Sequence, residues 1–145
     1  MTQLTRNFTL EEFLCKCPEC KGKLPSKAIL SNIEKLANVL QEYRIKLGKP
    51  MKISSGYRCP KHNKACGGAA GSIHLTGLAA DITVKGMSSE QLFEFFSGLD
   101  SSKAGKSKPV TKFKGVGLYK DSMAFTHVDL GVTKPRPNTW DYRNK

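Results

Sequence analysis

The sequence predicts an α+β fold, in which two main helices pack against a small, largely antiparallel sheet. Residues 26–47 carry apolar side chains at helical spacing, and residues 88–99 repeat this pattern over a shorter length. Short, mostly apolar segments predict four strands, at 51–54, 78–84, 113–119 and 124–130. Helices packed against such a sheet define the α+β class.

Capping residues mark where the expected helices begin and end. Thr9 is followed three positions later by a glutamate, which is a capping-box pattern and predicts a short helix over 9–14. Ser26 is the expected cap of the longest helix, which Gly48 ends. Ser88, with a glutamine three positions later, is expected to begin the second main helix.

Three segments lack a helical or strand period. Residues 56–71 are rich in Gly, Cys, His and Asn and are expected to form a loop. Residues 100–111 are rich in Ser, Lys, Gly and Pro and are expected to form a mobile linker. No strand is predicted in the tail, which contains two prolines and the only tryptophan, Trp140.

The length of 145 residues fits a single domain over 1–145. The net charge of +12 suits a polyanionic partner such as nucleic acid, an anionic polymer or an anionic lipid, although it also serves solubility alone. No apolar run approaches the length of about 20 residues that spans a bilayer. Residues 1–8 lack the apolar stretch of a secretory signal, so we expect synthesis in the cytoplasm without a signal peptide.

The five cysteines, an odd number, argue against a full disulfide framework. Cys15, Cys17 and Cys20 form a C-x-C-x-x-C cluster, which could complete a structural zinc site with Cys59 or Cys66. A Cys59–Cys66 disulfide is an alternative, and free buried thiols are the interpretation we favour. We expect none of the cysteines to be catalytic, because none lies in the segments that carry the candidate His and Asp residues.

Two segments, 72–81 and 125–129, concentrate residues capable of metal chemistry. They contain His74, Asp81 and His127, which together offer two imidazoles and one carboxylate. A catalytic zinc ion takes three such ligands and keeps a fourth position for water. Zinc lowers the pKa of that water to about 7 and polarises a carbonyl group, which is what amide hydrolysis requires.

The strand expected at 124–130 supports part of this interpretation. Because alternate residues of a strand share a face, Phe125, His127 and Asp129 are expected to point the same way. His127 and Asp129 would then form a polar pair in an otherwise apolar strand. A lone histidine on a strand is usually a satisfied core or surface residue, so spacing alone leaves a structural role open.

The pattern S-x-H-x-x-G-x-A-x-D at 72–81 resembles the signature of the zinc D-Ala-D-Ala peptidase family. These enzymes share an active-site layout with other cell-wall metallopeptidases and with the Hedgehog signalling domain. The S-G-Y-R segment at 55–58, H-V-D at 127–129 and the F…E-F opening at 8–13 also resemble the carboxypeptidase branch of the family. The resemblance extends over roughly residues 8–131 and implies a Hedgehog/D-Ala-D-Ala peptidase-like fold.

The resemblance implies Zn²⁺ as cofactor, with His74, Asp81 and His127 as ligands. It implies Arg58 as a catalytic cation that binds the substrate carboxylate or stabilises the oxyanion, since an Arg fork suits either role. A surface salt bridge is the alternative for Arg58. Ser72 is implied to bind near the substrate or to support the loop, and the glycine and alanine of the signature are implied to permit close packing around the metal.

The sequence departs from the family pattern at the general base. Many relatives have a catalytic glutamate three residues before the last histidine ligand, where this chain has Ala124, and others have a histidine where it has Phe125. Asp129 is therefore the nearest candidate for a general base or for a partner that orients His127. A reversed arrangement, with Asp129 on the metal and His127 as base, stays open.

The resemblance implies a zinc metallopeptidase that hydrolyses amide bonds of bacterial peptidoglycan, as a D-Ala-D-Ala carboxypeptidase or as an endopeptidase on stem or cross-bridge peptides. Such an enzyme is similar to a phage endolysin, and would act at the bacterial cell wall after release or as part of a phage particle. Anionic cell-wall polymer would suit its basic surface. The alternative is a non-catalytic zinc-binding module for cell-wall recognition or structure. A nucleic-acid partner is not expected, because the chain has no recognisable nucleic-acid-binding motif.

Overall fold

The computed structural model describes residues 2–20, 23–69, 71–131 and 138–144. The α-helices of this part are α1 (Lys27–Leu47), α2 (Pro60–Ala65) and α3 (Ser89–Ser97). The strands are β1 (Lys52–Ser55), β2 (Ala79–Thr83), β3 (Gly115–Leu118), β4 (Thr126–Asp129) and β5 (Thr139–Asp141). Four short 3-10 helices are η1 (Leu10–Phe13), η2 (Ile73–Thr76), η3 (Ser101–Lys103) and η4 (Asp121–Met123).

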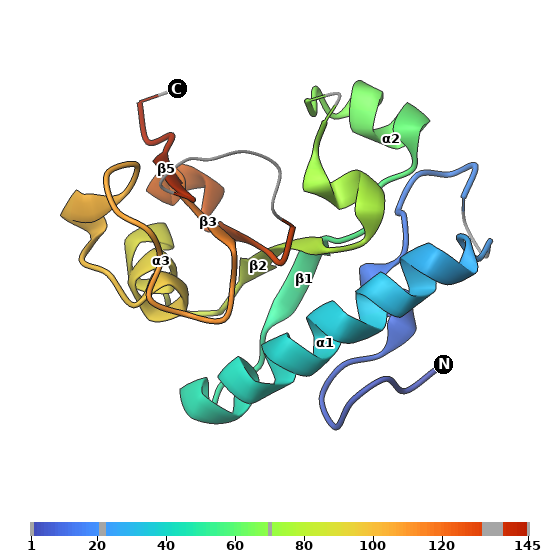
Figure 1. Ribbon diagram of the computed structural model, residues 1–145, viewed down its shortest axis with the longest axis horizontal. Helices are drawn as coiled ribbons and strands as arrows, with labels where there is room; N and C mark the ends of the chain where they lie inside the picture. The colour runs from blue at the N-terminus through green and yellow to red at the C-terminus, as the bar shows by residue number, and fades with distance from the viewer. Residues whose placement is uncertain (1, 21–22, 70, 132–137, 145) are drawn as a thin grey trace.

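The strands form one sheet in the order β1-β2-β4-β3-β5. The first four of these are antiparallel neighbours, whereas β5 runs parallel to β3 at the edge of the sheet. Figure 1 shows α1 running below β1, α3 beside β3, and α2 above the strands. The expected α+β class with a largely antiparallel sheet is therefore confirmed.

The core lies between the two main helices and one face of the sheet. Ser26 caps α1 by accepting a hydrogen bond from the N–H of Ile29 at 3.3 Å, as the sequence predicts. Five apolar residues of the predicted helix are buried: Ile33, Leu36, Ala37, Leu40 and Tyr43. They belong to one hydrophobic cluster with Leu92, Phe93 and Phe96 of α3 and with Ile53, Ile82, Val116 and Val128 of the sheet.

The opposite face of the sheet carries the polar residues, and its register aligns them in rows. Asp81 of β2 pairs with His127 of β4, His127 pairs with Gly117 of β3, and Gly117 pairs with Trp140 of β5. Residues directly opposite each other on neighbouring strands point to the same face. A second row runs beside the first and holds Ala79, Asp129 and Gly115.

Several local expectations are wrong. The loop expected at 56–71 contains α2, which was missed because it is too short to show a period and begins with Pro60 at a helix-compatible position. Residues 100–111 contain η3 rather than only irregular chain, with Ala104 buried and the N–H of Val110 bonded to the carbonyl of Ser97 at 2.6 Å. The tail contains β5, whose three residues are too few for an alternating pattern.

Gly77 contributes to packing against α1 and not to the space around the polar residues, contrary to the role implied for it. It ends η2 with φ of 82°, a left-handed conformation that favours glycine. A Cβ atom at this position would lie 3.0 Å from the side chain of Ile29 and 3.1 Å from that of Ile33. The glycine of the signature therefore allows the loop after η2 to approach the helix.

We expect Gly77→Ala to lower the free energy of unfolding by about 2–4 kcal/mol, from left-handed strain together with overpacking against α1. Gly86→Ala is the matched control, because Gly86 has φ of 86° but a Cβ atom there would meet no atom of the described residues within 4 Å. The control should lose only the strain contribution, about 1–2 kcal/mol. Urea denaturation of both variants measures the difference, and equal losses would contradict the packing role.

Candidate metal centre

Three polar side chains from three elements meet on the polar face of the sheet. His74 lies in η2, Asp81 in β2 and His127 in β4, and all three residues are buried. Asp81 Oδ1 lies 3.3 Å from His74 Nε2 and 3.2 Å from His127 Nδ1. The three atoms all lie within 4.8 Å of one another, which is a spacing that one metal ion can bridge.

The remaining polar atom of each side chain has another partner. His74 Nδ1 lies 2.7 Å from the carbonyl oxygen of Gly56, so this nitrogen carries the ring proton and donates it. His127 Nε2 lies 2.8 Å from Asp129 Oδ2, and it likewise donates to the carboxylate. When the two rings are neutral, His74 Nε2 and His127 Nδ1 therefore each carry a lone pair that faces the Asp81 carboxylate.

Lone pairs facing one another at this distance repel unless a cation lies between them. A proton or a metal ion meets this need, and two imidazoles with one carboxylate are a common donor set for zinc. The residues therefore fit the zinc ion that the sequence signature implies.

Asp129 stands behind His127 and is fully buried. Its Oδ2 accepts the hydrogen bond from His127, while its Oδ1 has no hydrogen-bond partner among the described residues. A Cβ atom at Gly115, the cross-strand neighbour, would lie 2.5 Å from Oδ2 of Asp129. Glycine at position 115 is thus what leaves room for this carboxylate.

Arg58 approaches Asp81 from the loop that follows β1. Its Nη2 lies 3.3 Å from Asp81 Oδ2, its Nη1 lies 3.3 Å from Asn63 Oδ1, and its Nε lies 3.0 Å from Ser55 Oγ. Guanidinium has five N–H donors, so these three contacts fix the side chain and leave one N–H on each terminal nitrogen. The side chain is 14% exposed, which places it at the edge of the centre and not on the open surface.

These residues lie in a cleft with a volume of about 790 Å³. Its lining includes residues 67–69 and 71–72 and four aromatic side chains, Tyr119, Phe125, Trp140 and Tyr142. The ring centroid of Trp140 lies 5.0 Å from that of His127. Gly117 leaves room for this ring, because a Cβ atom at position 117 would lie only 2.3 Å from Trp140 Nε1. Sequence reasoning missed Trp140 and Tyr119, since neither belongs to the signature.

Tyr119 presents its hydroxyl group near the centre. The hydroxyl oxygen accepts a hydrogen bond from Trp140 Nε1 at 3.0 Å. Burial raises the pKa of Tyr119 to about 12, so the phenol keeps its proton at neutral pH. Since its oxygen accepts from Trp140, this proton can be donated to a ligand in the cleft.

Opposing effects set the protonation of Asp81 and His127, which contact each other through Asp81 Oδ1. Burial alone would raise the pKa of Asp81, but hydrogen bonds from His127 and His74 outweigh it and hold this pKa well below its usual range. Burial alone would lower the pKa of His127, but its hydrogen bonds to Asp129 and Asp81 raise this pKa to about 9. The metal-free centre therefore holds a proton where a bound metal ion would replace it.

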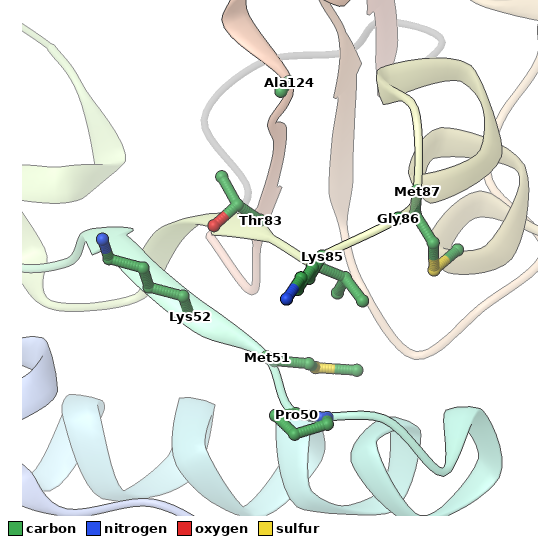
Figure 2. A pocket seen from close by; sticks show the side chains of 9 residues that line it. Pro50, Met51, Lys52, Thr83, Lys85, Gly86, Met87 and Ala124 are labelled. Atoms are coloured by element: carbon green, nitrogen blue, oxygen red, sulfur yellow. The ribbon is translucent and has the colours of Figure 1, made fainter.

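Of three further positions considered in the sequence, Ser72 and Phe125 line the cleft, whereas Ala124 lines a second pocket. Ser72 lines the cleft and caps η2 by accepting a hydrogen bond from the N–H of His74 at 3.3 Å. Phe125 also lines the cleft. Ala124 instead lines a separate pocket of about 490 Å³, shown in Figure 2, whose nine described lining residues include no His, Cys, Asp or Glu. Position 124 therefore does not face the centre.

In metal-free protein, His127 should make stability depend on pH. Its pKa is about 9 in the folded chain against an ordinary value of 6.5, so its contribution is complete below pH 6.5 and lost as the pH rises through about 9. We expect this loss to amount to about 1–3 kcal/mol of unfolding free energy. Urea denaturation of chelator-treated wild type and His127→Gln at pH 6 and pH 10 measures it, with the variant as the reference for all other titrating groups. The same pH dependence in both proteins would exclude the effect.

Comparison with known proteins agrees with this geometry. No curated protein matches the chain significantly. The sequence profile described as Peptidase M15 matches residues 6–129, a range that contains η1, α1 to α3 and the strands β1 to β4. Because this range covers most of the 145 residues and includes all three members of the centre, the chain belongs to the Peptidase M15 family, the zinc D-Ala-D-Ala peptidase family, and membership supports peptidase activity.

Proposed function

We propose that this chain acts as a single zinc peptidase domain that hydrolyses amide bonds in bacterial peptidoglycan peptides. It would do so as a D-Ala-D-Ala carboxypeptidase or as an endopeptidase on stem or cross-bridge peptides. The observation that carries the proposal is the convergence of one ligand atom each from His74, Asp81 and His127, which line a cleft in a Peptidase M15 chain.

The proposed zinc ligands are His74 Nε2, Asp81 Oδ1 and His127 Nδ1. When bound there, zinc supplies Lewis-acid polarisation of the scissile carbonyl and a water of lowered pKa. Gly56 supports this assignment, because its carbonyl fixes the ring of His74 with Nε2 directed inward.

Arg58 and Tyr119 are the proposed groups that bind the peptide. The two N–H groups of Arg58 that remain beside Asp81 can hold a substrate carboxylate or a developing oxyanion. The hydroxyl of Tyr119 offers a neutral donor to a carbonyl oxygen on the aromatic side of the cleft. Ser72 supports the loop that carries His74 through its cap of η2.

Asp129 is proposed as a positioning residue for His127 and not as the general base. Full burial and the hydrogen bond to His127 Nε2 direct its carboxylate away from the point where the three ligand atoms converge. The charge of this carboxylate keeps the imidazole oriented and strengthens its bond to a cation. The same geometry disfavours the reversed arrangement, with Asp129 on the metal.

We place the activity at the bacterial cell wall, after release of the protein or as part of a phage particle. None of the helices in the described segments is both long and apolar enough to cross a lipid bilayer. The net charge of +12 favours approach to anionic wall polymer.

A non-catalytic zinc-binding module for cell-wall recognition or structure is the second candidate. It is favoured by the lining of the cleft, in which Asp81 and Asp129 are the only carboxylates among the described residues and each is already paired. Binding of wall fragments with no change in their mass would support this module over the peptidase.

The proposed activity predicts that the zinc-loaded protein shortens purified muropeptides, and mass spectrometry identifies the bond from the mass lost. We expect His74→Ala to lose the zinc of this centre and all hydrolysis, because one ligand atom is removed. His62→Ala is the matched control, since the ring of His62 lies beside Cys66 and outside the centre, and it should keep both properties. Full zinc at this centre in folded His74→Ala protein would refute the ligand assignment.

A positioning role for Asp129 predicts a metal effect in Asp129→Asn. Zinc affinity should fall by roughly 10–100-fold, and activity should recover in excess zinc, because the amide still occupies the space beside His127. A general base would instead lose turnover by about 10²–10⁴-fold with unchanged zinc affinity. Competition with a chromogenic chelator measures the affinity, and turnover is compared at saturating zinc.

A further inference from the structure

A second group of metal-ligating side chains lies apart from the cleft. The sulfur atoms of Cys15, Cys17, Cys20 and Cys59 all lie within 4.8 Å of one another. Cys15 and Cys17 are buried, and Cys20 and Cys59 are partly buried. We call this group the four-cysteine cluster.

The fifth cysteine does not belong to the cluster. Cys66 is exposed, which is contrary to the expectation of buried thiols throughout, and its Sγ lies 3.5 Å from His62 Nε2. None of the five cysteines forms a disulfide, so the Cys59–Cys66 pair considered from the sequence is not formed. Cys59 and not Cys66 is the residue that joins the three N-terminal cysteines.

The distances between sulfur atoms match a tetrahedral metal site. Cys15 Sγ lies 3.6 Å from Cys17 Sγ, and Cys17 Sγ lies 3.7 Å from Cys59 Sγ. Four sulfurs at about 2.3 Å from one zinc ion would be about 3.8 Å apart. A disulfide would require about 2.05 Å, so this spacing fits a shared ion and not a covalent pair.

The local chain also has the features of a zinc-binding turn. Cys17-Pro-Glu-Cys20 has the C-x2-C spacing of structural zinc ligands, and the N–H of Cys20 closes the turn on the carbonyl of Cys17 at 3.1 Å. Backbone N–H groups donate to two of the sulfurs, from Cys59 to Cys15 Sγ at 3.4 Å and from His62 to Cys59 Sγ at 3.3 Å. Such donors stabilise the thiolate form that a metal requires.

We propose that the four-cysteine cluster binds a second, structural zinc ion. All four ligand positions are occupied by protein sulfur, so this ion has no position for water or substrate. The site is separate from the proposed catalytic centre and does not rest on the proposed peptidase function.

The second zinc ion would join two distant parts of the chain next to the cleft. It would connect the segment after η1, through Cys15, Cys17 and Cys20, to the start of α2 at Cys59. Cys59 directly follows Arg58, which contacts Asp81. The structural ion would thus hold the loop that positions Arg58.

Elemental analysis of protein purified under reducing conditions without chelator tests the proposal. We expect two zinc ions per wild-type chain, and one in His74→Ala/His127→Ala, because only the catalytic centre is lost. Cys20→Ser should also hold one, and Cys66→Ser is the matched control that should keep both. A zinc ion that survives the double histidine change but is lost in Cys20→Ser would support the cluster even if the catalytic centre held no metal.

Cobalt substitution and thiol analysis of wild-type protein avoid any dependence on variants that fail to fold. Cobalt bound to wild-type protein should give the intense near-ultraviolet charge-transfer absorption of thiolate ligands. Four cluster thiols that react at once with Ellman's reagent without releasing metal would overturn the proposal. Disulfides among the cluster cysteines in freshly isolated protein would overturn it as well.

Discussion

The site depends on one electrostatic constraint: two imidazole nitrogens and the carboxylate oxygen Asp81 Oδ1 direct their lone pairs toward one another. His74 Nε2 and His127 Nδ1 lie 3.3 and 3.2 Å from this oxygen, and such an arrangement is stable only with a cation among the three atoms. The surrounding chain maintains it by fixing the opposite atom of each side chain, through Gly56, Asp129 and Arg58. Strand β4 and the loop after β1 therefore hold the three ligand side chains in place, which catalysis at a metal ion requires of its ligands.

The same constraint explains why small residues cluster on this face of the sheet. Asp129 and Trp140 are large groups that must lie beside His127, and the strand between them, β3, provides the room with Gly115 and Gly117. Glycine within a strand weakens it, because it has no side chain to pack and loses more entropy on folding. The core face of β3 compensates with Val116 and Leu118, both fully buried.

The sequence predicted most reliably the features that depend on residues close together in the chain. His74 and Asp81 lie seven residues apart in one signature, and the alternation of β4 correctly placed His127 and Asp129 on one face. Helix boundaries followed from caps, as at Ser26, because a cap is a contact between near neighbours in the chain. These features needed no knowledge of the tertiary structure.

The features that were missed depend on pairing between distant segments. Trp140 enters the cleft only because β5 adds in parallel to β3, and no pattern in three residues predicts such a pairing. The choice between Cys59 and Cys66 was open for the same reason, since both lie in a segment without a period. Ala124 lines the pocket of Figure 2 and has φ of 52°, a left-handed backbone conformation that the sequence does not indicate.

Residues 56–59 connect the two groups of candidate metal ligands. The carbonyl of Gly56 orients His74, the N–H of Tyr57 donates to the carbonyl of Phe13 at 2.8 Å, and Arg58 contacts Asp81. A Cβ atom at Gly56 would lie 2.7 Å from the carbonyl oxygen of Phe13, so the segment is packed closely against η1. With Cys59 held in the four-cysteine cluster, each of the four consecutive residues has at least one fixed contact. Loss of a structural ion would therefore act on the cleft through the orientation of Arg58 and of the His74 ring, without removing any catalytic group.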